Sequence, residues 1–379
     1  MAKRIYVGID GVARQVKKMY VGVDGVARRV KKAYIGIGGV ARPCFGGVLE
    51  YYGAISSLSV GRANLAATTV GGYALFGGGN NGYVNGDQTT VDAYDTSLTR
   101  TNPTGLSEAK DDLSATTVGS YALFGGGAGD SINGSTVEAY NTSLTKTTPM
   151  ILRVGRYRLE ATTVGGYALF GGGFSPSYGV EEEVDAYDTS LTRSNPTGLS
   201  VSRDCLSATT VGSYALFGGG NKGYKNQYTT VDAYDTSLTR TTPTALSVGR
   251  SSLAAGAVGG YALFAGGEVG IDGCVATVDA YDQSLTRTIP TGLSVAKCSF
   301  PATTLGDYAL FGGGFDGDYN YSTVVDVYDT SLTRTNPTGL SVGRVSLAAT
   351  TVGSYALFGG GETSSGYGGV SAVVDAYSI

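Results

Sequence analysis

The sequence predicts an all-β fold made of seven copies of one short unit. A run of Tyr-Ala-Leu-Phe followed by glycines begins at Tyr73 and recurs six more times, at spacings of 48, 46, 47, 47, 47 and 47 residues. A fixed period of this length indicates a repeat architecture rather than one irregular core. Each unit contains four short strand-like segments and no helical periodicity. Seven four-stranded units closed into a ring form a β-propeller, which buries repeated small sheets against one another.

The composition agrees with many short strands joined by tight turns. Glycine accounts for 61 of 379 residues and proline for 9, and 42% of the residues are apolar, which suffices for a large core. Residues 1–46 carry ten Lys and Arg against two Asp, whereas the remaining residues carry 17 basic and 29 acidic side chains. We therefore expect two parts with different partners, a basic leader at 1–46 and a propeller at 47–379.

The N-terminus is charged from Lys3 onward and contains no long apolar stretch. We therefore expect neither a secretory signal nor a membrane span, and synthesis in a bacterial cytoplasm. The four cysteines stand at different places in the repeat and show no paired spacing. We interpret them as scattered small hydrophobic residues, without a disulfide framework or a metal cluster. They are Cys44, Cys205, Cys274 and Cys298.

The leader repeats a 14-residue unit three times. Asp10-Gly11 and Asp24-Gly25 each stand between β-branched residues, which is a strong signal for a two-residue hairpin turn, and Gly38-Gly39 fills the same place in the third copy. Pairing of Ile9 with Val12 across the first turn would gather the apolar residues on one face. One hairpin of this size cannot bury that face alone, so it must pack on its sister copies, another subunit or a larger assembly.

Basic residues with tyrosines between them run along the leader and allow two interpretations. They could form a nucleic-acid patch. They could instead be solvated turns and edge-strand lysines that discourage aggregation of sheets. We favour a docking function in a protein assembly, with homo-oligomers through the leader as an open alternative, and nucleic acid is not the expected partner. The expected anchor residues are Tyr6, Arg14, Tyr20, Arg28 and Tyr34.

The second copy shows the expected strands in order. The first spans 113–118, the second begins at Tyr121 and ends in glycines, the third spans 136–141 and the fourth spans 144–149. Every connection but one is too short for a crossover helix, so neighbouring strands should be antiparallel. The last unit ends at Ile379 after its third strand, and residues 48–62 align with the end of a fourth-strand segment. We therefore expect the N-terminal segment to complete the last blade.

Three features together resemble kelch repeats, which form propellers of this kind. They are the glycine run after an apolar strand, a tyrosine about fifteen residues later, and a basic residue that begins the next unit. The resemblance covers roughly residues 48–379. The tryptophan that kelch units carry on the fourth strand is absent, and Thr101, Ser194 or Thr335 stands near its place, which implies looser packing between blades. The tyrosines are Tyr94, Tyr140, Tyr187, Tyr234, Tyr281, Tyr328 and Tyr377.

The amino-acid sequences of the units and of the leader also resemble those of proteins encoded by phages and prophages of Gram-positive gut bacteria. The strings that carry this resemblance are VDAYDTSLTRTNPTGLS, ATTVGGYALFGGG and YVGVDGVARRVKK. It implies a virion structural protein of the tail, neck or fibre type, with a particle-proximal leader and a variable distal domain. Such a domain would decorate the particle or attach it to a host receptor, and the protein would be located in the virion.

Histidine is absent from the chain, which removes the commonest general base and every Ser-His-Asp or Cys-His arrangement. A copper site of the kind some kelch propellers carry would need imidazole ligands, and the Asp boxes of sialidase-like propellers are missing. Paired aspartates such as Asp92 and Asp95 recur in most units, so we interpret them as turn or capping residues. A calcium loop starting at Asp316 would lack its glycine and its glutamate. We expect no catalytic residue, no cofactor and no metal.

The connections between the second and third strands differ in length and content, while the strands themselves are near copies. In a propeller these connections emerge on the same face as those that lead into the next unit. They combine tyrosine with small polar residues, a composition typical of recognition surfaces, and drift of exposed loops is the alternative. The expected binding residues are Tyr83, Asn85, Tyr178, Tyr224, Tyr228, Tyr319, Tyr321 and Tyr367.

One basic residue per unit should lie on the same face near the channel mouth. A ring of positive charge could attract an anionic glycan or a phosphate polymer, but we favour pairing with neighbouring carboxylates. The residues are Arg62, Lys110, Arg156, Arg203, Arg250, Lys297 and Arg344.

These observations lead us to expect a non-enzymatic virion component. Its leader would bind other virion proteins, and its loops would bind a host surface glycan or protein. A bacterial protein-interaction scaffold is the second hypothesis. A carboxylate-based glycan hydrolase is the third hypothesis, because this class of enzyme uses two carboxyl groups and needs no histidine.

Overall fold

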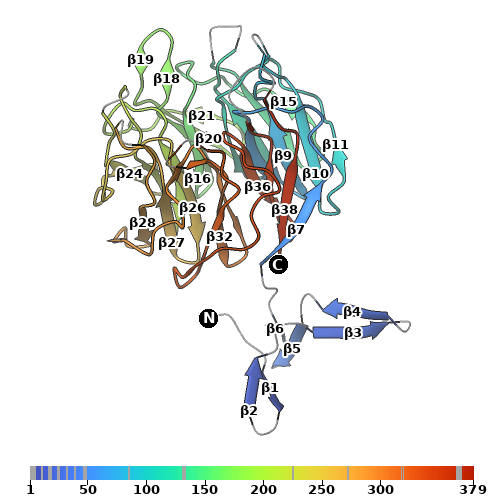
Figure 1. The fold of residues 1–379 in the computed structure, drawn as a ribbon. Helices are drawn as coiled ribbons and strands as arrows, with labels where there is room; N and C mark the ends of the chain where they lie inside the picture. The colour runs from blue at the N-terminus through green and yellow to red at the C-terminus, as the bar shows by residue number, and fades with distance from the viewer. Residues whose placement is uncertain are drawn as a thin grey trace.

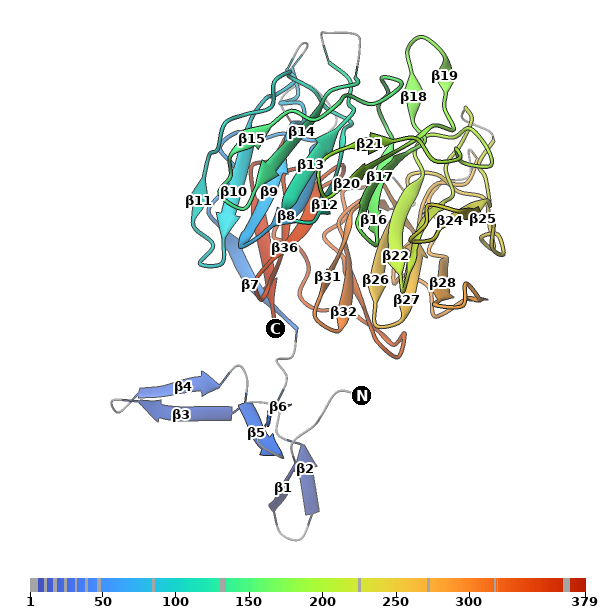
Figure 2. The ribbon, with the colours of Figure 1, turned by 180° about the vertical axis from the view of Figure 1, so that it is seen from behind.

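The computed structural model describes most of the chain. The described residues are 6–9, 12–15, 19–23, 26–30, 33–37, 40–45, 49–83, 86–129, 134–223, 226–270, 273–316, 318, 320–363 and 369–379. Over these ranges the secondary structure is all β, in agreement with the sequence prediction. Figures 1 and 2 show the sheets arranged around a ring.

Seven four-stranded antiparallel sheets form the blades of a β-propeller. Blade 1 contains β8 (Ala66–Val70), β9 (Tyr73–Gly77), β10 (Val91–Asp95) and β11 (Arg100–Thr101). Blade 2 contains β12 (Ser114–Val118), β13 (Tyr121–Gly125), β14 (Val137–Asn141) and β15 (Lys146–Thr147). Blade 3 contains β16 (Glu160–Val164), β17 (Tyr167–Gly171), β20 (Val184–Asp188) and β21 (Arg193–Ser194). Blade 4 contains β22 (Ser207–Val211), β23 (Tyr214–Gly218), β24 (Val231–Tyr234) and β25 (Arg240–Thr241).

The remaining blades repeat this order. Blade 5 contains β26 (Ala254–Val258), β27 (Tyr261–Ala265), β28 (Val278–Asp282) and β29 (Arg287–Thr288). Blade 6 contains β31 (Ala302–Leu305), β32 (Tyr308–Gly312), β34 (Val325–Asp329) and β35 (Arg334–Thr335). Blade 7 contains β36 (Ala348–Val352), β37 (Tyr355–Gly359), β38 (Val374–Ser378) and, from the other end of the propeller, β7 (Glu50–Ile55).

Closure of the ring follows the sequence prediction. β7 pairs antiparallel with β38, so the segment before blade 1 supplies the fourth strand of blade 7. The innermost strands contact one another in order around the ring, and β36 of blade 7 contacts β8 of blade 1. Figure 1 shows β7 beside β38 near the C-terminus. The chain therefore closes its own circle by strand pairing.

Fourth strands in blades 1–6 are shorter than expected, because each consists of two residues. In each of these blades a proline follows the strand within a few residues, such as Pro103 in blade 1 and Pro149 in blade 2. Proline lacks the N–H group that a ladder needs, so pairing stops there. The β7 segment contains no proline and extends over six residues.

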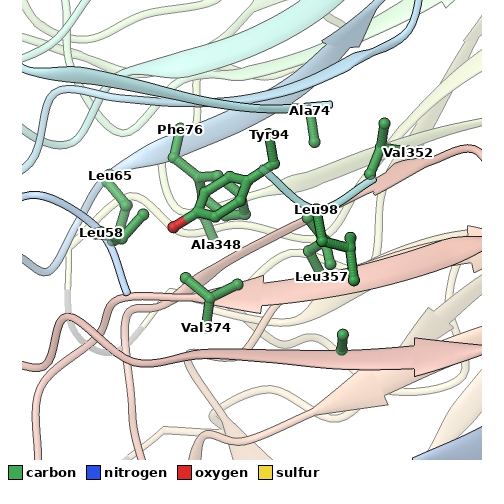
Figure 3. Close-up of a cluster of buried hydrophobic side chains, with 11 residues drawn as sticks. Leu58, Leu65, Ala74, Phe76, Tyr94, Leu98, Ala348, Val352, Leu357 and Val374 are labelled. Carbon is green, nitrogen blue, oxygen red and sulfur yellow. The ribbon is translucent and has the colours of Figure 1, made fainter. Parts of the chain in front are cut away.

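Seven buried clusters fill the interfaces between neighbouring blades. Figure 3 shows the cluster between blades 7 and 1, where Phe76 and Tyr94 meet Leu357 and Val374. The rings of Phe76 and Tyr94 pack edge to face with centroids 6.0 Å apart. The Tyr94 hydroxyl donates a 2.7 Å hydrogen bond to the Ser56 carbonyl, in the segment that follows β7. Fully buried phenylalanine and tyrosine thus fill these interfaces in a chain without tryptophan.

Leader strands form three antiparallel hairpins, as the 14-residue period predicts. They are β1 (Tyr6–Ile9) with β2 (Val12–Gln15), β3 (Met19–Val23) with β4 (Val26–Val30), and β5 (Ala33–Ile37) with β6 (Val40–Phe45). The expected pairing of Ile9 with Val12 is confirmed. The turn residues Asp10-Gly11, Asp24-Gly25 and Gly38-Gly39 lie outside the described residues. The division into two independent parts at residue 46 stays a prediction.

The expectation that all cysteines are unpaired was wrong for one pair. Cys274 and Cys298 form a disulfide across 24 residues of sequence. Cys274 lies in the connection between the second and third strands of blade 5, and Cys298 lies in β30 (Lys297–Cys298), just before blade 6. The two connections meet on the same face of the propeller, which the position of each cysteine within the repeat does not reveal. Cys205 is free.

Candidate functional site

The variable connections gather at one end of the ring, as expected. Residues that lead into the first strand of a blade form isolated bridges with residues that follow the second strand of that blade. Ala63 bridges Asn80 in blade 1, and Asp204 bridges Asn221 in blade 4. Both kinds of connection therefore occupy one face, which we call the loop face. The small hairpin of β18 (Phe174–Ser175) and β19 (Gly179–Val180) projects from it at the top of Figure 1.

The opposite end of the ring, which we call the turn face, is uniform. In blade 1 the carboxylate of Asp95 accepts hydrogen bonds from the N–H groups of Ser97 and Thr99, at 2.8 and 2.9 Å. The equivalent residue of the next five blades makes the same two contacts. This half of the recurring aspartate pair caps a turn, as the sequence suggested.

The other half, represented by Asp92, does something different from the expected turn capping. Asp92 is fully buried, and its Oδ2 lies 2.8 Å from Nη1 of Arg62, which is also fully buried. Asp92 also accepts a hydrogen bond from the Ser59 N–H. The interpretation of Asp92 and its equivalents as turn residues was therefore wrong. They lie inside the blade, where they pair with the recurring basic residue.

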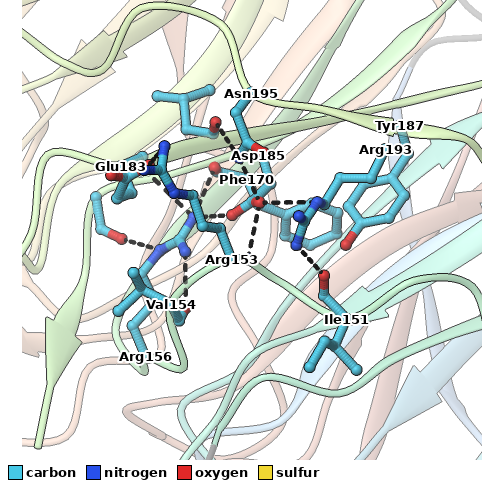
Figure 4. A network of polar contacts seen from close by, with 12 residues as sticks. Ile151, Arg153, Val154, Arg156, Phe170, Glu183, Asp185, Tyr187, Arg193 and Asn195 are labelled. Atoms are coloured by element: carbon cyan, nitrogen blue, oxygen red, sulfur yellow. Dashed lines mark hydrogen bonds and ion pairs between the residues drawn. The ribbon is translucent and has the colours of Figure 1, made fainter. Parts of the chain in front are cut away.

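All seven basic residues of the expected ring are buried in such pairs. Figure 4 shows the arrangement in blade 3, where Arg156 lies 2.8 Å from Asp185 and donates to backbone carbonyls, including that of Phe170. Asn195, which directly follows the fourth strand β21, donates to the same carboxylate. The pairs are Arg62–Asp92, Lys110–Glu138, Arg156–Asp185, Arg203–Asp232, Arg250–Asp279, Lys297–Asp326 and Arg344–Asp375.

This burial decides between the two interpretations of the basic ring. A cation that is hidden from solvent and paired with a carboxylate offers no attractive surface to an anionic polymer. Burial opposes ionisation of Asp92, but the Arg62 guanidinium and the hydrogen bonds from Ser59 outweigh it and hold the pKa of Asp92 below its usual range. The ring therefore belongs to the framework of the propeller, where it joins each incoming connection to the third strand of its blade.

Four of the eight expected binding residues lie within the described part of the chain. Tyr178, at the tip of the β18–β19 hairpin, and Tyr83 are 77% and 62% exposed. Tyr228 is half-buried, and Tyr321 is half-buried with its hydroxyl 3.4 Å from Oε1 of Glu362. The other four, Asn85, Tyr224, Tyr319 and Tyr367, lie outside the described residues. The anchor residues Tyr6, Arg14, Tyr20, Arg28 and Tyr34 lie on described leader strands whose side chains are not described.

At the axis of the loop face, one residue from each blade joins a closed ring of backbone hydrogen bonds. Each residue lies two positions after the basic residue and donates its N–H to the carbonyl of its counterpart in the preceding blade. Asp112 donates to Asn64 at 3.0 Å, and Asn64 closes the circle by donating to Ser346 at 2.9 Å. All seven have a positive φ of 49–55°. They are Asn64, Asp112, Arg158, Cys205, Ser252, Ser299 and Ser346.

A cavity of about 860 Å³ occupies the axis inside this ring. One alanine from each of the seven innermost strands, such as Ala67 and Ala115, lines it with small side chains. Its polar wall is uneven, because the charged residues that line it in the described part of the chain come from blades 2–5. They are Asp112, Arg158, Glu160, Asp204 and Glu268.

Burial shifts the protonation of this wall. It raises the pKa of Glu160 to about 8. It also raises the pKa of Asp111, behind the wall, to about 7, with added repulsion from Asp112 and Asp87. Burial also raises the pKa values of Asp112 and Asp204. Arg158 lies 3.2 Å from Asp112 and offsets part of this negative charge.

The sequence prediction missed these wall residues. The signal was present, because the segment from the basic residue to the first strand reads RANLA, KDDLS, RYRLE, RDCLS, RSSLA, KCSFP and RVSLA in the seven units. The leucine or phenylalanine of this segment is buried in every blade, while the residues around it differ. Glu160 stands where the other blades have Ala, Ser or Pro.

The structure adds two findings about metals and membranes. Over the described residues no group of three His, Cys, Asp or Glu side chains is placed to hold a metal ion. Asp316 accepts hydrogen bonds from the N–H groups of Asp318 and Asn320, the pattern of a capped turn. No helix capable of crossing a bilayer occurs in the described part of the chain.

Comparison with known proteins adds no family. The chain matches no model of a known protein family, and no curated protein sequence matches it.

Proposed function

We propose that the protein is a non-enzymatic recognition component of a phage particle, built on a kelch-type propeller. In this proposal the leader at 1–46 binds other virion proteins, and the loop face binds a glycan or protein of the host surface. The observation that carries the recognition part is the division of the propeller into a uniform framework and a single divergent end.

The framework is uniform in detail. Every blade places the same aromatic pair at its interface, and every blade encloses one cation and one carboxylate. The turn face repeats the same capped turn in six blades. Residues with these contacts cannot change independently, so differences between blades collect where side chains are not needed for folding.

The loop face has the properties of a recognition surface. Tyr178 and Tyr83 present large rings to solvent, and tyrosine provides contact area with few rotatable bonds to immobilise. The loops stand on a rigid scaffold, which is the arrangement in which loops commonly bind. A bacterial interaction scaffold would use the same face, so the partner distinguishes these two hypotheses.

The chemistry of the described residues favours binding over catalysis. The chain lacks histidine, and the recurring carboxylates inside the blades are buried in ion pairs, out of reach of a polymeric substrate. Glycoside hydrolysis needs two carboxyl groups on either side of the scissile bond. The carboxylates of the axial wall remain as the candidates for such an activity, and an assay of reducing-sugar release from host wall polysaccharide tests it.

Two experiments test the proposal. Mass spectrometry of purified particles, with immunogold labelling, should find the protein in the virion; its absence from particles would remove the phage assignment. Pull-down of the purified full chain on host cells should show binding that the Tyr83→Ser, Tyr178→Ser double variant weakens. Ser97→Ala, Ser190→Ala on the turn face is the matched control, and equal binding by all three proteins would contradict the loop face as the recognition surface.

A further inference from the structure

We propose that the axial cavity of the loop face binds one ammonium-bearing sugar, with the carboxylates of Glu160 and Asp204 as partners of its ammonium group. This inference rests on the proposed function, because it names the ligand class of the recognition face. Nothing in the repeat pattern requires these two carboxylates, since other blades build the same framework without them.

The charge of the cavity wall selects a cation. Among the described residues, Asp112, Glu160, Asp204 and Glu268 line the cavity together with one guanidinium, that of Arg158. Arg158 is already engaged, because it lies 3.2 Å from Asp112 and its Cζ lies 5.4 Å from the centre of the Tyr157 ring. Burial raises the pKa of Glu160 and of Asp204, and a bound ammonium group would offset this effect by favouring the ionised carboxylates. Glu160, Asp204 and Glu268 therefore favour a positively charged ligand.

Asp204 provides an independent indication that a ligand belongs there. It lines the cavity, it is 6% exposed, and its Oδ1 has no hydrogen-bond partner among the described residues. A buried carboxylate oxygen without a donor is costly, and an ammonium group with three N–H bonds would satisfy it. Its counterparts in the other blades are Ala63, Asp111, Tyr157, Ser251, Cys298 and Val345, so no structural rule of the repeat demands an acid.

The rest of the wall suits a sugar better than a bare cation. The rings of Tyr157 and Phe174 lie 5.4 Å apart on one side of the cavity and offer an apolar surface to a pyranose ring. Asn221 and Ser252 also line it and can exchange hydrogen bonds with hydroxyl groups. A metal ion is a poorer occupant, because no group of three suitable side chains converges in the described residues.

The wall also sets the number of ligands. Blades 1, 6 and 7 contribute Asn64, Ser299 and Ser346 to the same cavity, so the acidic side is not repeated around the ring. We therefore expect one ligand for each chain, in contrast to a protein that binds one sugar on each blade.

Isothermal titration of the full chain with a glucosamine oligosaccharide tests this proposal, with the N-acetylated oligosaccharide as the uncharged comparison and a lysine peptide as a second amine. We expect 1:1 binding of the glucosamine oligomer and much weaker binding of the other two. Failure of the glucosamine oligomer to bind, or several sites per chain, would overturn the proposal. Equal affinity for the lysine peptide would overturn the assignment to a sugar.

Variants locate the site. Glu160→Ser should fold, because blades 2 and 4 carry Ser114 and Ser207 at this place, and it should weaken binding by about tenfold or more. Asp204→Asn should act in the same direction. The matched control is Glu182→Gln, an exposed acid in the same face of blade 3 that does not line the cavity. Unchanged affinity in Glu160→Ser with an unchanged melting temperature would exclude this cavity.

The outcome is separable from that of the proposed function. Sugar binding by a protein that fails to bind host cells would leave this inference standing and remove the proposed function. Cell binding that depends on Tyr83 and Tyr178 but occurs without any affinity for the glucosamine oligomer would remove this inference and leave the proposed function standing.

Discussion

Lys110 Nζ lies 2.9 Å from Oε2 of Glu138, so that blade 2 joins a shorter cation to a longer carboxylate. Five of the other blades pair an arginine with an aspartate, as in Arg62–Asp92. The side chain of glutamate is one methylene longer than that of aspartate. Lysine ends in a single ammonium group, whereas arginine ends in a planar guanidinium that can donate two parallel hydrogen bonds. Blade 6 pairs Lys297 with Asp326 at 3.1 Å, so lysine also pairs with the shorter carboxylate, whereas none of the seven pairs joins arginine to glutamate.

The first prediction concerns this pair. Glu138→Asp alone should have a small effect, because blade 6 contains a buried lysine–aspartate pair. Lys110→Arg alone should destabilise the protein by about 2–4 kcal/mol, because it places the longer cation against the longer carboxylate, a combination that none of the seven pairs shows. The double variant recreates the Arg–Asp pair of the other blades and should recover most of that loss. Denaturant unfolding of the four proteins measures the coupling. Losses that simply add in the double variant would show that the lengths are not matched.

The second prediction concerns the glycines after the second strand. Gly78 has a φ of +67°, and a Cβ built there would lie 2.7 Å from the Lys110 carbonyl oxygen. Gly78→Ala should therefore lower the free energy of unfolding by at least about 1–3 kcal/mol. Gly72→Ser is the control, because blades 2, 4 and 7 carry serine at this turn position. Thermal unfolding of both variants gives the comparison, and similar melting temperatures would contradict the steric argument.

The third prediction concerns pH. Burial raises the pKa of Glu160 from 4.5 to about 8, so between these values the folded protein holds a proton that the unfolded chain releases. Stability from this group is therefore present at low pH and is lost as pH rises from about 4.5 to about 8. We expect the melting temperature of the natural protein to fall more between pH 5 and pH 8 than that of Glu160→Ser. Parallel curves would show that Glu160 titrates normally.

The fourth prediction concerns the disulfide. Reduction of Cys274–Cys298 should lower the melting temperature, because a closed loop of this length contributes about 3 kcal/mol in the chain-entropy account. Cys274→Ser should give the same melting temperature with and without reductant. Cys205→Ser, which removes the free thiol, should keep the response to reductant. An unchanged melting temperature of the natural protein under full reduction would argue against the bond.

The fifth prediction concerns the boundary between leader and propeller. Removal of residues 1–46 keeps β7, which starts at Glu50, and should leave a folded propeller that no longer enters particles. Removal of residues 1–56 also deletes β7 and leaves the edge of β38 unpaired, so this form should aggregate. Size-exclusion chromatography distinguishes the two. Aggregation of the shorter deletion would show that the leader is part of the folded unit.

The sequence predicted the architecture because the period and the apolar runs determine it. Seven copies of the Tyr-Ala-Leu-Phe strand and the missing fourth strand after Tyr377 sufficed to predict the ring and its closure. Composition alone singles out the tyrosines of the loops, and Tyr83 and Tyr178 are exposed, but their function in binding stays a prediction. Asp92 was misassigned as a turn residue because its neighbour Asp95 caps the turn, and sequence spacing does not tell which of two nearby carboxylates points inward.

The axial wall was missed although its residues stand out when the seven units are aligned, because a single unit does not show which residues share the cavity. Asp112, Glu160 and Asp204 come from three neighbouring blades and line the same cavity. The disulfide was missed for the same reason, because Cys274 and Cys298 belong to connections of different kinds that converge on one face. Contacts between connections of neighbouring blades have no signature within a single unit.

The backbone ring at the axis has a consequence for how this protein can acquire new specificity. Main-chain hydrogen bonds from N–H to carbonyl join all seven members, with one added side-chain ion pair between Arg158 and Asp112, and the chain already accepts Asn, Asp, Arg, Cys and Ser there. Substitution at these positions changes the side chains at the axial opening, while the backbone ring that shapes the opening is kept. A library randomised only at these seven codons should therefore yield mostly folded proteins with altered ligands.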